Sequence, residues 1–277
     1  PRPSEFDEDE PNPDDNTAEF TLLSDADLER MAEHARAARS HGRLVIGSLP
    51  GTAFGHVSHV PAMFMKNPKG IRDVAEWYIS VAARQDFIHA VFSRQVEVAL
   101  ENLKRILAAV GNDAYDAVFV CGTDFGTQIS TFCSKDTFTT LYQPYYRRVN
   151  DWIHANTPWK TFKHSCGAIE PFVEPLIESG FDILNPVQCS ATGMDPRLLK
   201  DKYGDRIVFW GGSIDTQQTL PFGTPEQVRA EALGRCRIFS PGGGFVFNAI
   251  HNVQARTPVA NMVALLDAVK EFNAAGK

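Results

Sequence analysis

The sequence has no concentration of positive charge and no apolar segment long enough to cross a membrane. Lys and Arg together number 27 against 34 acidic residues, so the net charge is −7 at pH 7. A chain without a basic stripe attracts phosphate groups weakly, so we expect neither nucleic acid nor a membrane surface as a partner. The first residues also lack a positively charged stretch followed by an apolar run, so no secretory signal is expected.

Cysteine is scarce, and the number of cysteines is odd. The five cysteines are spread along the chain at Cys121, Cys133, Cys166, Cys189 and Cys236. Without a secretory signal, this spacing favours reduced thiols over a disulfide framework, and we expect a cytoplasmic protein. Cys121 and Cys133 are expected to pack in the core rather than to react.

Acidic residues are concentrated at the start of the chain. Residues 1–16 hold seven acidic residues and one arginine, which account for −6 of the net charge of −7. This segment is also rich in proline and has few apolar side chains to bury, as is typical of disordered chains. We therefore expect residues 1–20 to form an acidic disordered arm or linker, followed by one folded domain over residues 21–277.

Short apolar runs recur along the rest of the chain and are separated by helical patterns. They cover residues 44–49, 117–120, 160–166, 182–187, 207–213 and 244–250. Such runs are typical of parallel strands that are covered on both faces. The repeated strand–helix order predicts an α/β fold, either a doubly wound sheet or a (β/α)8 barrel. No G-x-G-x-x-G pattern follows a strand, which argues against a dinucleotide-binding sheet.

Polar side chains follow these apolar runs at the point where each strand is expected to end. They are Asp124, His164 and Cys166, Gln188, Asp215, and the pair His251 and Asn252. In parallel βα folds the carboxyl ends of the strands meet at one rim, where active sites are built. We therefore expect these side chains to belong to one site.

The pair His164 and Cys166 has the spacing of two residues on one face of a strand. An imidazole and a thiolate on one face can begin a metal site, although two ligands do not complete one. Taken alone, such a pair is more often a buried thiol beside a hydrogen-bonded histidine. The other polar residues at the strand ends favour the metal site.

Four motifs resemble those of the uroporphyrinogen decarboxylase superfamily. They are "GTDFGTQ", "HSCGAIEPFVEPLIESGFDILNPVQ", "FWGGSIDTQQTLPFGTPEQV" and "GGGFVFNAIHNVQARTPVANMVALLDA". They look most like the branch of methylcobamide:coenzyme M methyltransferases and corrinoid-dependent demethylases. The resemblance runs from about residue 44 to the C-terminus and implies a (β/α)8 TIM-type barrel. Because six strand signals are present where the family barrel has eight, we expect the N-terminal part of the barrel to be missing from this chain.

The resemblance also implies a zinc site. His164 and Cys166 match the family's H-x-C pair, whereas His251 stands where the family has a further cysteine. Histidine binds zinc as well as cysteine does, so His251 is expected to be the third ligand. Asp124 is then either a fourth ligand or a carboxylate that handles the substrate.

The remaining polar residues are expected to surround the substrate. Gln188, Asp215 and Asn252 would line its site, and His56 would reach it from the loop after the first strand. The partners expected are a small-molecule substrate, a separate corrinoid protein and a second copy of the chain in a homodimer.

Three hypotheses of function follow. The first is zinc-dependent methyl transfer from a methylated corrinoid (cobalamin) or methylated small molecule to a thiol or similar acceptor, which zinc would activate by lowering its pKa. The second is a metal-free decarboxylase-like lyase, in which Asp124 would stabilise a cationic intermediate formed from a carboxylated substrate. The third is a non-catalytic barrel that serves as a subunit of a corrinoid system.

Overall fold

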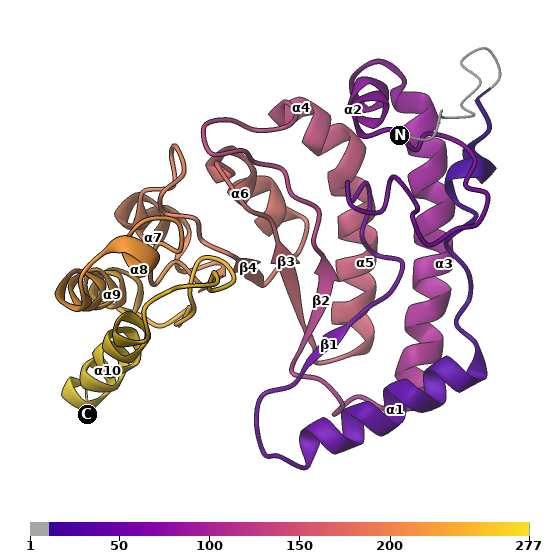
Figure 1. The fold of residues 1–277 in the computed structure, drawn as a ribbon. Coiled ribbons are helices and arrows are strands. Elements are labelled where there is room, and N and C mark those ends of the chain that lie inside the picture. Colours follow the sequence, from indigo (N-terminus) through magenta and orange to yellow (C-terminus); the bar gives the residue numbers. More distant parts are fainter. Residues whose placement is uncertain (1–10, 277) are drawn as a thin grey trace. The chain divides into compact units, whose positions relative to one another are not determined.

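The computed structural model describes residues 11–276, which form two compact units (Figure 1). The first unit comprises the described residues up to Asp124 together with residues 133–163 and 178–181. The second unit comprises residues 125–132, 164–177 and the described residues from Asp182 onward.

The described residues contain six short strands. They are β1 (Ile46–Ser48), β2 (Ala117–Cys121), β3 (Lys160–His164), β4 (Ile183–Asn185), β5 (Val208–Trp210) and β6 (Phe245–Val246). Each lies within or overlaps one of the predicted apolar runs, and the strand order in the sheet follows the order in the chain. The strand pairs β1–β2, β2–β3, β4–β5 and β5–β6 are all parallel. This is the strand–helix order of a (β/α)8 TIM-type barrel, so the predicted fold class is confirmed.

The first unit places long helices beside β1, β2 and β3. Its helical segments are η1 (Pro13–Asn16), α1 (Asp25–Arg39), α2 (Val74–Ala83), α3 (Gln85–Val110), α4 (Lys135–Thr137), η2 (Phe138–Tyr142) and α5 (Gln143–Asn156). Helix α1 begins with the reciprocal hydrogen bonds of Ser24 and Asp27, and α3 ends at Gly111, whose φ of +82° suits glycine. Helix α5 packs against β2 through Tyr146, whose hydroxyl lies 3.1 Å from Cys121 Sγ.

The second unit holds the remaining helices. They are α6 (Glu170–Glu178), α7 (Pro196–Tyr203), α8 (Thr219–Phe222), α9 (Pro225–Phe239) and α10 (Val259–Ala275). Thr224 and Gln227 form a capping box at the start of α9. The apolar core of this unit includes Ile214, Leu220 and Val228, which pack with Leu265 of α10. Among residues 11–276, none of the helices combines the length and apolarity needed to cross a bilayer.

The segment expected to be a disordered arm is folded over residues 13–19. Asn16 is only 4% exposed, and its side chain exchanges two hydrogen bonds with the main chain of Ile71, at 3.0 and 2.8 Å. The prediction of a disordered arm over residues 1–20 is therefore wrong for this part. Residues 1–10 lie outside the described residues.

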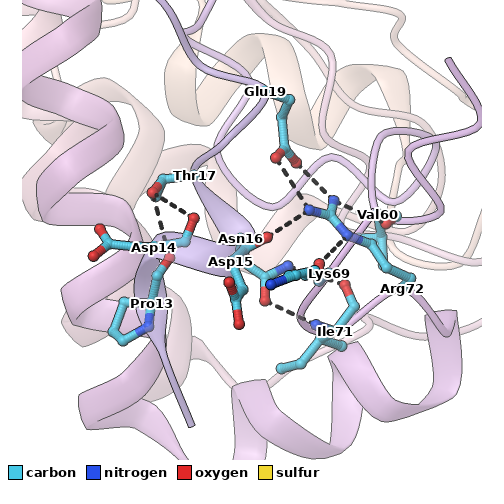
Figure 2. A network of polar contacts seen from close by, with 10 residues as sticks. All are labelled: Pro13, Asp14, Asp15, Asn16, Thr17, Glu19, Val60, Lys69, Ile71 and Arg72. Carbon is cyan, nitrogen blue, oxygen red and sulfur yellow. Dashed lines mark hydrogen bonds and ion pairs between the residues drawn. The ribbon is translucent and has the colours of Figure 1, made fainter. Parts of the chain in front are cut away.

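Arg72 is the centre of the contacts that fix this segment (Figure 2). Its guanidinium binds both carboxylate oxygens of Glu19, at 2.8 and 3.1 Å. The other partners of the guanidinium are the main-chain carbonyl oxygens of Asp15, Val60 and Lys69. We call these five residues the Arg72 network. The acidic composition predicted disorder, but Glu19 is paired with the Arg72 cation and both side chains are at most 7% exposed.

Candidate metal centre

The H-x-C pair lies at the end of β3, as the sequence predicts. Cys166 Sγ lies 3.5 Å from His164 Nε2. The two-residue period places both side chains on one side of the chain, so the two ligand atoms converge without any distortion of the strand. Both residues are half-buried, which leaves them open to a substrate or an ion.

Asp124 joins this pair from the segment after β2. The carboxylate of Asp124, the imidazole of His164 and the thiol of Cys166 each offer one ligand atom, and all three atoms lie within 4.8 Å of one another. Zinc bonds of ~2.0–2.3 Å are within reach of all three after small side-chain rotations. The donor set of one oxygen, one nitrogen and one sulfur suits zinc. No second group of three such side chains this close occurs in the part of the chain that the structure describes.

His164 is oriented by Asn185, the last residue of β4. His164 Nδ1 lies 2.7 Å from Asn185 Oδ1, and the amide nitrogen of Asn185 donates to the carbonyl of Trp210 at 2.9 Å. Because the amide nitrogen is used there, the amide oxygen faces the ring, so Nδ1 carries the proton. The lone pair of Nε2 therefore faces Cys166, as a metal ligand requires. Asn185 was not predicted from the sequence, although its place at a strand end was a usable signal.

Cys166 sits on a turn that other buried groups hold. The Gly167 N–H donates to Gln188 Oε1 at 2.9 Å, and Gln188 Nε2 donates to Gln128 Oε1 at 2.8 Å. Ser165 Oγ accepts from the N–H of Phe125, the residue after Asp124, at 3.0 Å. Gln188, which was expected to line the substrate, is buried and holds this turn.

The residues that follow β5 and β6 do not join the group. His251 and Asn252 are exposed on the loop after β6. The group of three converging side chains therefore contains Asp124, whereas His251, expected as the third ligand, lies outside it. The Asp215 carboxylate bonds to the main chain of its own loop. Its Oδ1 accepts from the N–H groups of Gln217 and Gln218 at 2.6 and 3.2 Å.

His56 lies beside the end of β2 in the first unit. A Cβ added to Gly122 would lie 3.3 Å from His56 Nε2, and the ring stacks on His59 at 4.8 Å between centroids. Tyr78 of the same unit was not among the residues predicted from the sequence. Burial raises the pKa of Tyr78, and the charges of Asp124 and Cys133 raise it further.

The other four thiols are poor ligands or nucleophiles in this structure. Burial raises the pKa of Cys133 to about 11 and that of Cys189 to about 12. Burial also raises the pKa of Cys236 to about 11. Cys121 is fully buried, in contact with Thr123 and Tyr146. Cys166 is therefore the thiol best placed for chemistry.

Comparisons with known proteins agree with this architecture. The family model "Uroporphyrinogen decarboxylase (URO-D)" matches residues 11–272. The uroporphyrinogen decarboxylase of Psychromonas ingrahamii is 32% identical over 89 residues, which are 31% of this chain and 24% of that protein. The one from Chlorobium luteolum is 26% identical over 147 residues, which are 51% of this chain and 39% of that protein. The matched region thus spans well under half the length of these relatives.

A solved structure shows the same fold over most of the chain. A methyltransferase from Methanosarcina mazei superposes with a TM-score of 0.62 and 16% identity, covering 93% of this chain and 69% of that one. The family match and the strand order lead to one conclusion. The chain belongs to the uroporphyrinogen decarboxylase (URO-D) family.

Proposed function

We propose that this protein is a zinc-dependent methyltransferase that acts on a methylated corrinoid or methylated small molecule, with a thiol or similar group as acceptor. The observation that carries the proposal is the convergence of Asp124, His164 and Cys166 within 4.8 Å. The structural likeness to a methyltransferase agrees with it. Zinc held by these residues would lower the pKa of an acceptor thiol, so that the thiol reacts as a thiolate at neutral pH.

The residues of the chain have distinct tasks in this proposal. His164 offers a neutral Nε2 because Asn185 holds its other nitrogen. Cys166 and Asp124 each offer an anionic atom, so the ligands carry two negative charges that balance a divalent cation. An acceptor thiolate would then add charge to a neutral centre, which favours a strong nucleophile. The half-buried position of the group leaves one side open to the acceptor.

The methyl carrier in this proposal is a corrinoid on a separate protein. The expected homodimer is likewise part of this proposal. A metal-free lyase is the second candidate, since the curated relatives are uroporphyrinogen decarboxylases. In that case Asp124 would stabilise a cationic intermediate and His164 and Cys166 would be polar lining. The metal content of the purified protein separates the two functions.

We expect Cys166→Ser and Asp124→Asn each to weaken zinc binding at least tenfold, because each removes one of three converging ligand atoms. The measurement is titration with Co²⁺, whose visible absorption reports thiolate coordination. His251→Ala is the control, since His251 is exposed and outside the group. A wild-type protein that binds neither metal would contradict the proposal. A loss of metal in His251→Ala alone would restore the ligand set expected from the sequence.

A further inference from the structure

We propose that Lys163 is a positioning residue of the metal centre, which holds the segment carrying Asp124 against the strand carrying His164. The inference rests on the proposed function. Lys163 directly precedes His164 in the chain, and its side chain is 0% exposed. Lysine is almost never buried to this extent unless its ammonium has specific partners, because removal of the charge from water is costly.

Two contacts of Lys163 lie on the segment that leads to Asp124. Its Nζ donates to the main-chain carbonyl of Thr123 at 2.6 Å. The same atom lies 3.7 Å from Cys121 Sγ and 5.8 Å from the centroid of the Tyr146 ring. The ammonium thus reaches across from β3 to the end of β2.

This contact continues the pairing of the two strands beyond their ladder. The register of β2 against β3 shifts between Phe119 and Cys121, and the last pair is Cys121 with Lys163. The bond from Lys163 to Thr123 therefore holds the two segments together at the point where their ligands begin.

Thr123 is fixed at three atoms, which makes the contact specific. Its N–H donates to Cys121 Sγ at 3.3 Å, and its hydroxyl donates to the carbonyl of Phe54 at 2.7 Å. Its carbonyl oxygen, the third atom, accepts from Lys163. That carbonyl belongs to the peptide unit that leads into Asp124, so its orientation sets the direction in which the Asp124 side chain leaves the main chain.

The test compares Lys163→Met with Thr161→Val. Thr161 is also 0% exposed, lies two residues earlier on β3, and donates its hydroxyl to the Gly180 carbonyl at 2.8 Å. Both variants remove buried hydrogen bonding from the same side of one strand, but only Lys163→Met frees the segment before Asp124. We expect Lys163→Met to weaken Co²⁺ binding at least tenfold and to change its visible spectrum. Thr161→Val should change binding less than threefold.

A second readout does not depend on the metal. Hydrogen exchange of residues 123–126 should be at least tenfold faster in Lys163→Met than in Thr161→Val, at a temperature where both are folded. If Lys163→Met does not fold, Lys163→Gln keeps a shorter polar group and allows the same comparison. Wild-type exchange and wild-type Co²⁺ affinity in the Lys163 variant would overturn the inference. A further outcome is that the wild-type protein binds no metal while Lys163→Met still exchanges faster than Thr161→Val. That result would overturn the zinc function but leave the role of Lys163 in holding the segment before Asp124.

Discussion

Replacement of Glu19 with glutamine should lower the free energy of unfolding by about 3–5 kcal/mol. The Glu19 and Arg72 side chains are 6% and 7% exposed. The amide keeps the shape of the carboxylate but not its charge, so the guanidinium would remain buried without a counter-charge. Since the main-chain carbonyls of Asp15, Val60 and Lys69 also accept from Arg72, the arginine cannot simply turn toward solvent. Urea-induced unfolding at pH 7, followed by circular dichroism, measures the change.

Asp14→Asn is the matched control for this substitution. Asp14 lies in the same segment and pairs with Arg94 at 2.7 Å, but the two side chains are 69% and 45% exposed. Water screens such a pair, so its loss should cost less than about 0.5 kcal/mol. Equal effects of the two variants, or a loss below about 1 kcal/mol for Glu19→Gln, would show that the Arg72 network contributes no more than a surface ion pair.

Substitution of Gly167 by alanine should abolish metal binding, with affinity at least a hundredfold weaker. Gly167 has a φ of +90°, and a Cβ there would lie 2.4 Å from the carbonyl carbon and oxygen of Gly126 and 2.6 Å from the Thr127 carbonyl oxygen. All three are main-chain atoms, so the turn itself must move, and it carries Cys166. We also expect a loss of roughly 2–5 kcal/mol of stability from the strained backbone and the overlap.

Gly193→Ala separates the backbone effect from the overlap. Gly193 also lies in the second unit and has a φ of +78°, but its added Cβ would be 3.8 Å from the Glu170 side chain, which is ordinary contact. This variant should lose about 1–2 kcal/mol from its left-handed backbone and keep its Co²⁺ affinity. If Gly167→Ala binds Co²⁺ as tightly as Gly193→Ala does, the turn at Gly167 does not determine the geometry of the site.

The parts of the fold that were predictable are those that a local pattern determines. Buried parallel strands are mostly apolar, so the six apolar runs located the six strands. The period of a strand likewise placed His164 and Cys166 on one side. These rules relate neighbouring residues, and they need no knowledge of distant contacts.

The parts that were not predictable depend on contacts between distant residues. Asn16 bonds Ile71, 55 residues away, and a composition averaged over residues 1–16 cannot reveal one such pairing. The loop after β6 has no hydrophobic period, so nothing in the sequence showed that it would leave His251 in solvent. Gln188 was correctly placed at a strand end, but its side chain turns to the Gly167 main chain, which only the folded turn presents.

The attachment of Asn16 and Glu19 bears on where the folded domain begins. The family match starts at residue 11, before both residues. A shortened recombinant protein that starts at residue 21 would leave Arg72 without its carboxylate and the Ile71 main chain without Asn16. We expect such a protein to collect in inclusion bodies, whereas one that starts at Pro11 keeps both contacts. Residues 11–20 are then an integral part of the domain, and expression trials should set their boundary ahead of them.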